Sequence, residues 1–255
     1  MKKRIGLLLI FVLLMLPLAG CQKPQENEEM KEIKSILFIG NSYTYYNDMP
    51  SAIFSELLKA DGREVQVTAI TKGGWTLEKF ADPTDTYGAA VDAALSEVGK
   101  YDIVILQEQS LRPAINKEKF FAAAENLAAR IRAAGAEPVL YATWGRHSDS
   151  PDLETYHMTN HSMTVRLDAS YSELGEKIGA PVVHVGRAFY EIYTERSEIE
   201  LYNPDRSHPS YAGSYLAASA LYAALFGDVP QGFDGDLPAE TAALLRATGE
   251  KYAKD

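Results

Sequence analysis

A serine follows an apolar run near the start of the sequence, at a place where a hydroxyl could do chemistry. The run Ser35–Ile39 ends at Gly40, and Asn41 and Ser42 come next. In an open parallel sheet, ligands bind beyond the carboxyl ends of the strands, and Ser42 is expected to lie there. A serine becomes a nucleophile when a base takes its proton. Position alone leaves a second interpretation open, in which Ser42 only caps the next helix or fills a turn.

A candidate base stands near the other end of the sequence, in the segment NPDRSHPS. Histidine is the usual base because its pKa lies near neutrality. Asp205 lies three residues before His208, and in a turn of helical geometry such residues face the same way. Asp205 could then accept a hydrogen bond from Nδ1 and leave Nε2 for Ser42. Of the remaining histidines, His184 is expected in a core strand and His147 at the border of the site. His157 and His161 are expected on a solvated helix face rather than at a metal.

Attack on an ester creates an oxyanion, which needs preorganised hydrogen-bond donors. The segment TKGGWT supplies Gly73 and Gly74, whose backbone can approach a ligand closely. The segment LQEQS supplies Gln107 and Gln109, whose side-chain amides donate without carrying a charge. Both segments follow expected strands, so we expect their donors at the same edge of the sheet as Ser42.

Short apolar runs alternate with longer helical patterns from Lys34 onward. Their nearly continuous apolar character is typical of strands that are covered on both faces. The expected strands are 35–39, 65–70, 103–106, 138–142 and 181–185, and the expected helices are 49–60, 89–98, 117–134, 159–178, 210–226 and 241–252. This alternation predicts an α/β domain with one parallel sheet and helices on both faces.

The first residues have the pattern of an export signal. A basic start and an apolar run of 5–16 precede Leu18–Cys21, which resembles a bacterial lipobox. We therefore expect a lipoprotein signal peptide at 1–20, lipid on Cys21, a flexible tether at 21–33 and a catalytic domain at 34–255. The protein would be exported and anchored to a bacterial membrane. Removal of the signal would take the formal charge from −10 to −13, which argues against nucleic acid as a partner.

Taken together, these blocks resemble the SGNH, or GDSL-like, hydrolase superfamily. Gly40–Ser42 reads G-N-S where the family has G-D-S, and the pair Gly73–Gly74 and the D-x-x-H of Asp205–His208 follow in the family order. The resemblance extends from about residue 36 to residue 226. It implies Ser42 as nucleophile, His208 as base and Asp205 as orienting acid. It also implies a flavodoxin-like three-layer α/β/α sandwich whose five-stranded parallel sheet has the order 2-1-3-4-5.

The third block departs from the family pattern, which usually has G-x-N-D. This chain has Gln107-Glu-Gln-Ser, which resembles the block of the carbohydrate acetylesterase branch. That resemblance implies an oxyanion hole formed by Ser42, Gly74 and Gln107, with Gly73 and Gln109 in reserve.

Several side chains are expected at the rim of the site. Asn41 could brace the nucleophile loop, because asparagine tolerates the unusual dihedral angles of a sharp turn. The nearby aromatic residues could stack on sugar rings or pack against the sheet edge; they are Tyr43, Tyr45, Tyr46, Trp75 and Trp144.

The leading interpretation is therefore an exported serine esterase that needs neither metal nor organic cofactor. Its substrate would be a small acyl ester, in the first place acetyl, on a carbohydrate, and it would react through an acyl-enzyme. One alternative keeps the same triad in a lipase or lysophospholipase. Another is a lipoprotein that binds carbohydrate without hydrolysing it, since a fold does not by itself fix a function.

Overall fold

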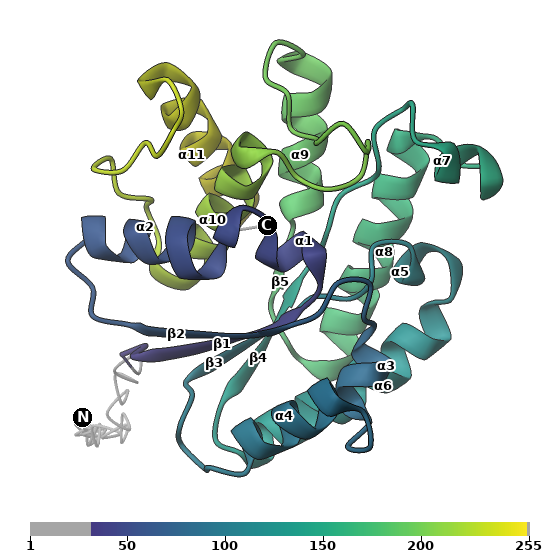
Figure 1. Ribbon diagram of the computed structural model, residues 1–255, viewed down its shortest axis with the longest axis vertical. Coiled ribbons are helices and arrows are strands. Elements are labelled where there is room, and N and C mark those ends of the chain that lie inside the picture. The colour runs from purple at the N-terminus through teal and green to yellow at the C-terminus, as the bar shows by residue number, and fades with distance from the viewer. Residues whose placement is uncertain (1–31, 254–255) are drawn as a thin grey trace, which may run out of the picture. The chain divides into compact units, whose positions relative to one another are not determined.

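Five short strands form one parallel sheet in the computed structural model, which describes residues 32–253 (Figure 1). The strands are β1 (Ser35–Gly40), β2 (Gln66–Thr71), β3 (Ile103–Leu106), β4 (Glu137–Tyr141) and β5 (Val182–Val183). Their order, β2-β1-β3-β4-β5, confirms the predicted flavodoxin-like sheet. The predicted signal peptide, Cys21 and all but the last two residues of the predicted tether lie outside the described residues.

The interior strand β1 is buried on both faces. Ile36 and Phe38 pack into one hydrophobic cluster, whereas Leu37 and Ile39 pack into another on the opposite face of the sheet. Side chains of a strand alternate between its two faces, so a strand with a helical layer on each side must be apolar throughout. That requirement explains the continuous apolar run before Gly40.

Helices cover both faces of the sheet (Figure 1). The first cluster is completed by α2 (Ser55–Ala60), α9 (Val185–Glu195), α10 (Tyr211–Phe226) and α11 (Ala239–Ala253). The second is completed by α3 (Leu77–Ala81), α4 (Thr86–Leu95), α6 (Lys117–Ala133) and α8 (Asn160–Ile178). Short turns of helix lie in the connections: α1 (Ser42–Tyr45), the 3-10 turn η1 (Tyr46–Asp48), the π turn η2 (Pro50–Phe54), α5 (Arg112–Ile115) and α7 (Pro151–Thr155).

The helix α9 is the main departure from the expected elements. The apolar run 181–185 predicts a longer strand, but the pairing with β4 stops at Val183 and a helix begins at Val185. Gly186 lies in its first turn, where a Cβ would clash with the carbonyl oxygen of Thr143. The absence of a side chain at Gly186 therefore lets α9 begin close against the segment that follows β4.

Among the helices of residues 32–253, none is both long enough and apolar enough to span a membrane.

Candidate active site

The nucleophile loop begins where β1 ends, at a glycine that cannot carry a side chain. A Cβ at Gly40 would clash with Thr44 Oγ1 and lie 2.7 Å from Gln107 Oε1. Asn41 then caps α1: its side-chain oxygen accepts from the N–H of Tyr43 at 3.1 Å, and its amide nitrogen donates to the carbonyl of Trp75 at 3.0 Å. Ser42 is the first helical residue. The close approach at Gly40 and the Asn41 cap thus fix the position of the Ser42 side chain.

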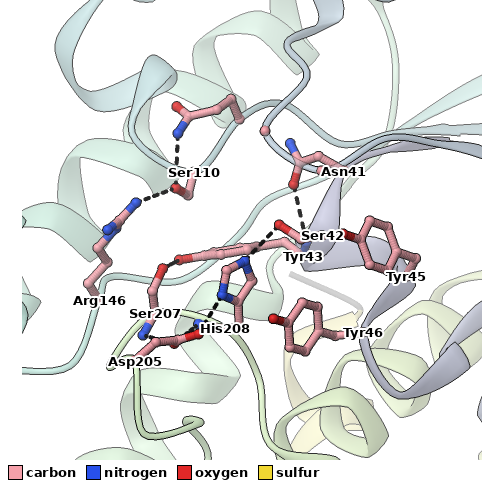
Figure 2. Close-up of a pocket in the computed structure, with 13 residues that line it drawn as sticks. Asn41, Ser42, Tyr43, Tyr45, Tyr46, Ser110, Arg146, Asp205, Ser207 and His208 are labelled. Carbon is pink, nitrogen blue, oxygen red and sulfur yellow. Dashed lines mark hydrogen bonds and ion pairs between the residues drawn. The ribbon is translucent and has the colours of Figure 1, made fainter. Parts of the chain in front are cut away.

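Three side chains from the two ends of the domain form one hydrogen-bonded chain (Figure 2). Ser42 Oγ lies 2.8 Å from His208 Nε2, and His208 Nδ1 lies 2.7 Å from Asp205 Oδ2. The other oxygen of Asp205 accepts from the backbone N–H groups of Ser207 and His208, both at 2.9 Å. The structure therefore brings together the three residues that the sequence singled out, in the geometry that proton transfer from a serine requires.

The carboxyl group of Asp205 is held in its charged form. Partial burial alone would raise its pKa, but the hydrogen bonds from His208 and Ser207 outweigh burial and lower the pKa below the ordinary value. An ionised Asp205 accepts a hydrogen bond from the Nδ1–H group of His208. This fixes the proton on Nδ1 and leaves Nε2 free to accept the proton of Ser42.

Two residues that line the cavity, Ser42 and Gly74, carry backbone N–H groups that could serve an oxyanion. The N–H of Ser42 belongs to the first turn of α1, where helix geometry offers it no partner. Gly74 adopts a left-handed φ of 73°, and the space where its Cβ would stand is open. Neither N–H donates a hydrogen bond to another group within residues 32–253. Both Gly73 and Gly74 line the cavity, so this loop is suited to hold an oxyanion.

The expectation that Gln107 is the third oxyanion donor is corrected by its position. Gln107 is completely buried below the nucleophile loop and does not line the cavity. Its side-chain oxygen accepts from the N–H of Asn41 at 2.8 Å and from Thr44 Oγ1 at 2.9 Å, while its amide nitrogen donates to the carbonyl of Glu108. Gln107 therefore braces the loop that carries Ser42, and its burial away from the cavity keeps its amide from an oxyanion there.

The reserve residue Gln109 does line the cavity. Its side-chain oxygen accepts from the N–H groups of Leu111 and Arg112, which leaves the amide nitrogen to point toward Ser110 Oγ at 3.3 Å. A hydrogen bond of this length is weak, so the amide nitrogen could leave Ser110 Oγ for a stronger acceptor in the cavity. Of the two glutamines, Gln109 is therefore the one that borders the cavity.

Two of the expected rim residues are core residues instead. Trp144 is completely buried, stacked between Tyr43 at 4.5 Å and Phe189 at 3.9 Å, and its Nε1 donates to the carbonyl of Ser207. Tyr43 is 3% exposed, and its hydroxyl lies 2.8 Å from Ser207 Oγ at the floor of the cavity. These rings support the loop of the base and leave no face for a sugar.

The other aromatic residues differ in their access to the cavity. Trp75 does not line it, because its Nε1 donates to Asp85 and the amine of Lys79 lies over its ring. Tyr45 and Tyr46 both line the cavity, as does Asn41. Tyr46 is stacked on His208, so the exposed aromatic ring at the cavity is that of Tyr45.

Three residues at the cavity carried no signal in the sequence: Ser110, Arg146 and Ser207. Arg146 follows β4 and donates to Ser110 Oγ at 3.1 Å (Figure 2). It also forms an ion pair with Asp152. Each lies in a connection beyond the carboxyl end of the sheet, and only the folded arrangement brings these connections together. The cavity that they complete has a volume of about 460 Å³.

A buried carboxyl group lies between the two loops that carry the candidate oxyanion donors. Glu108 is completely buried, and its Oε1 accepts from the N–H of Leu77 at 3.1 Å and of Gln109 at 2.6 Å. Burial raises its pKa from 4.5 to about 7, although these two hydrogen bonds and Arg112 act in the opposite direction. Its second oxygen has no hydrogen-bond partner among the described residues.

We expect this carboxyl group to make the protein less stable as the pH rises. Between pH 4.5 and about 7 the folded protein keeps the proton of Glu108 while the unfolded chain has lost it, so the free energy of unfolding falls across that window. Glu108→Gln removes the titration. From pH 5 to pH 8, the stability of this variant relative to the wild type should rise by roughly 2 kcal/mol. Urea unfolding of both proteins at the two pH values measures it, and a constant difference would contradict the assignment.

In residues 32–253, no group of three or more His, Cys, Asp or Glu side chains is arranged to hold a metal ion.

Comparison with solved structures places this arrangement in a family. A protein from Slackia heliotrinireducens, described as an SGNH hydrolase, is 31% identical in sequence, with a TM-score of 0.63. The similarity covers 73% of this chain and 96% of that one. The chain belongs to the SGNH hydrolase superfamily. As a member, it is a serine hydrolase whose fold and site order agree with the family resemblance of its sequence.

More distant structures share the fold of this SGNH hydrolase. A DUF4886 family protein from Bacteroides uniformis is 17% identical, with a TM-score of 0.71, over 86% of this chain and 94% of that one. An acetylxylan esterase from Geobacillus stearothermophilus is 18% identical, with a TM-score of 0.52, over 74% and 92%. No family model matches the sequence of this hydrolase, and no curated protein matches it.

Proposed function

We propose that this SGNH hydrolase is an esterase that removes small acyl groups, in the first place acetyl, from carbohydrate. The observation that carries the proposal is the chain of hydrogen bonds from Ser42 through His208 to Asp205, which opens into the cavity of about 460 Å³. Two further features support a carbohydrate ester. The exposed ring of Tyr45 lines the cavity, and aromatic faces suit sugar rings. The acetylxylan esterase from Geobacillus stearothermophilus has the same fold.

The first half of the reaction forms an acyl-enzyme. Ser42 Oγ attacks the ester carbonyl while His208 Nε2 takes its proton, and the ionised Asp205 stabilises the imidazolium that results. The N–H groups of Ser42 and Gly74 and the amide of Gln109 hold the oxyanion. His208 then gives the proton to the leaving alkoxide as the carbon–oxygen bond breaks, and the sugar hydroxyl departs.

The second half returns the enzyme to its starting state. Water enters in place of the alcohol, and His208 Nε2 takes one of its protons as the oxygen attacks the acyl carbon. Collapse of the second tetrahedral intermediate returns the proton to Ser42 Oγ and releases the carboxylic acid. The same three donors stabilise both intermediates, so the enzyme needs one oxyanion hole for the whole cycle.

Acetate release from a panel of acetylated polysaccharides and sialic acids tests the substrate class, and nitrophenyl esters of increasing chain length test the acyl group. We expect release from at least one acetylated glycan and a sharp fall in rate beyond short acyl chains. A preference for long chains would indicate a lipase or lysophospholipase instead. Glycan binding without hydrolysis would indicate a carbohydrate-binding lipoprotein.

We also propose that the enzyme is exported and held at a bacterial membrane through lipid on Cys21. The support is the lipobox-like segment Leu18–Cys21 behind a basic, apolar start. Metabolic labelling with radioactive palmitate should mark the protein, and an unlabelled protein would exclude the anchor.

A further inference from the structure

Contact between the nucleophile and the base depends on two segments that are distant in the sequence. Ser42 and His208 are 166 positions apart. Directly after the nucleophile helix α1, the turn η1 lies against the segment that carries His208, and Figure 2 shows Tyr46 of this turn beside the imidazole. The turn η1 therefore lies where its side chains can hold the segment of Ser42 and the segment of His208 in alignment.

Asn47 ties this turn to the backbone that follows the base. Its amide nitrogen lies 3.2 Å from the carbonyl oxygen of Pro209, 3.0 Å from that of Ser210 and 2.8 Å from Ser214 Oγ. Ser214 Oγ in turn donates to the carbonyl of Tyr46 at 3.2 Å. These hydrogen bonds join the residues directly after His208, and the start of α10, to the residues directly after α1.

The backbone of the turn is held in an unfavourable conformation. Asn47 has a φ of 54° and Asp48 a φ of 50°, both in the left-handed region that residues with a Cβ avoid. Asparagine and aspartate tolerate this region better than most residues, but it persists only where surrounding contacts hold it. The bonds from Asn47 are the contacts that do so here.

Tyr46 adds a second contact, to the base itself. Its ring is stacked on the imidazole of His208, with ring centroids 4.3 Å apart and planes inclined by 6°. A flat neighbour on one face limits rotation of the imidazole about its Cβ–Cγ bond. The electron-rich face of an aromatic ring also attracts a cation, so the stack favours the imidazolium that forms during proton transfer.

We propose that Tyr46 and Asn47 are positioning residues that hold His208 in register with Ser42, Tyr46 through the stacked ring and Asn47 through its amide bonds to the following backbone. The inference rests on the proposed function, since the rate that it affects is that of ester hydrolysis. It assigns a role to the tyrosine–asparagine pair after the nucleophile helix.

Asn47→Gly separates the amide from the backbone conformation, because glycine adopts a left-handed φ freely and only the side chain is lost. We expect kcat for nitrophenyl acetate to fall at least about 10-fold with little change in KM, because the serine and its base lose alignment while the cavity keeps its shape. Asn47→Asp, which cannot donate, should lose as much. The matched control is Asp48→Gly, which relieves the same strain and should retain wild-type kcat. Equal losses at both glycine variants, or none at Asn47→Gly, would overturn the role of the amide.

The stacked ring is tested by two substitutions of Tyr46. Leucine removes the ring face, so kcat should fall about as far as in Asn47→Gly, whereas phenylalanine keeps the ring and should lose much less of the wild-type kcat. A phenylalanine variant as slow as the leucine variant would show that the hydroxyl matters and would overturn the proposed stacking role.

A crystallographic measurement tests the inference without any turnover, so it remains decisive even if the wild type hydrolyses none of the esters. The distance from Ser42 Oγ to His208 Nε2, 2.8 Å in the wild type, should lengthen beyond hydrogen-bond reach in Asn47→Gly. An unchanged distance would overturn the inference. Failure of the proposed function would appear separately, as an inactive wild type with the distance still sensitive to Asn47.

Discussion

Ser42→Ala should lower kcat/KM for acetate esters by about 10⁴-fold or more, because it removes the atom that forms the proposed acyl-enzyme. The remaining rate would come from the oxyanion donors and from substrate binding. Loss of one hydroxyl from a residue that is 8% exposed should leave the melting temperature nearly unchanged. Initial rates on nitrophenyl acetate, together with a thermal melt, measure both effects.

The control for this experiment is Ser51→Ala, an exposed serine in η2 whose hydroxyl makes one long contact within residues 32–253, to the carbonyl of Asp48. It should retain wild-type activity. If Ser42→Ala kept more than one hundredth of the wild-type rate, the acyl-enzyme mechanism would be wrong.

Asp205→Asn should lower kcat by about 10³- to 10⁴-fold with little effect on folding. The carboxylate accepts a hydrogen bond from His208 Nδ1, and two backbone N–H groups reach its other oxygen. These groups can orient the asparagine oxygen toward themselves, which turns its NH₂ group toward Nδ1. His208 would then carry its proton on Nε2 and could no longer accept the proton of Ser42.

The pH dependence of the wild-type rate supplies a further check. The hydrogen bonds to Asp205 keep its pKa below the ordinary value, so Asp205 stays charged above pH 5. Any fall of wild-type activity above pH 5 must therefore have a cause other than protonation of Asp205. Asp149→Asn, an exposed aspartate beside His147, is the control and should behave as the wild type. Equal rates in Asp205→Asn and the wild type would remove Asp205 from the mechanism.

The sheet could be predicted from the sequence because its interior strands β1, β3 and β4 are short, largely apolar runs. In β1 and β3 both faces are buried, so burial alone requires the pattern. The helix α9 could not be predicted, because the run around Val183 reads as continuous strand. What ends the strand is a tertiary contact, the close approach of Gly186 to Thr143.

The serine, its base and its acid could be nominated because the chemistry restricts the residue types and D-x-x-H restricts their spacing. The third oxyanion donor could not, because two glutamines two positions apart both follow β3. Side chains alternate along a strand, and Gln107 continues the side of Ile105 into the core, below Gly40. Gln109 lies beyond the strand and reaches the cavity. Burial of Trp144 likewise follows from the stack with Phe189, a residue of the unpredicted helix α9.

The most direct test of the central claim, that Ser42 is a nucleophile activated by His208, is the site of covalent modification by a fluorophosphonate. The enzyme is treated with the reagent, digested and analysed by mass spectrometry. The mechanism predicts one adduct per chain, on Ser42, formed much more slowly in His208→Ala. An adduct on a different residue, or an esterase that hydrolyses acetate esters while Ser42 stays unmodified, would contradict it.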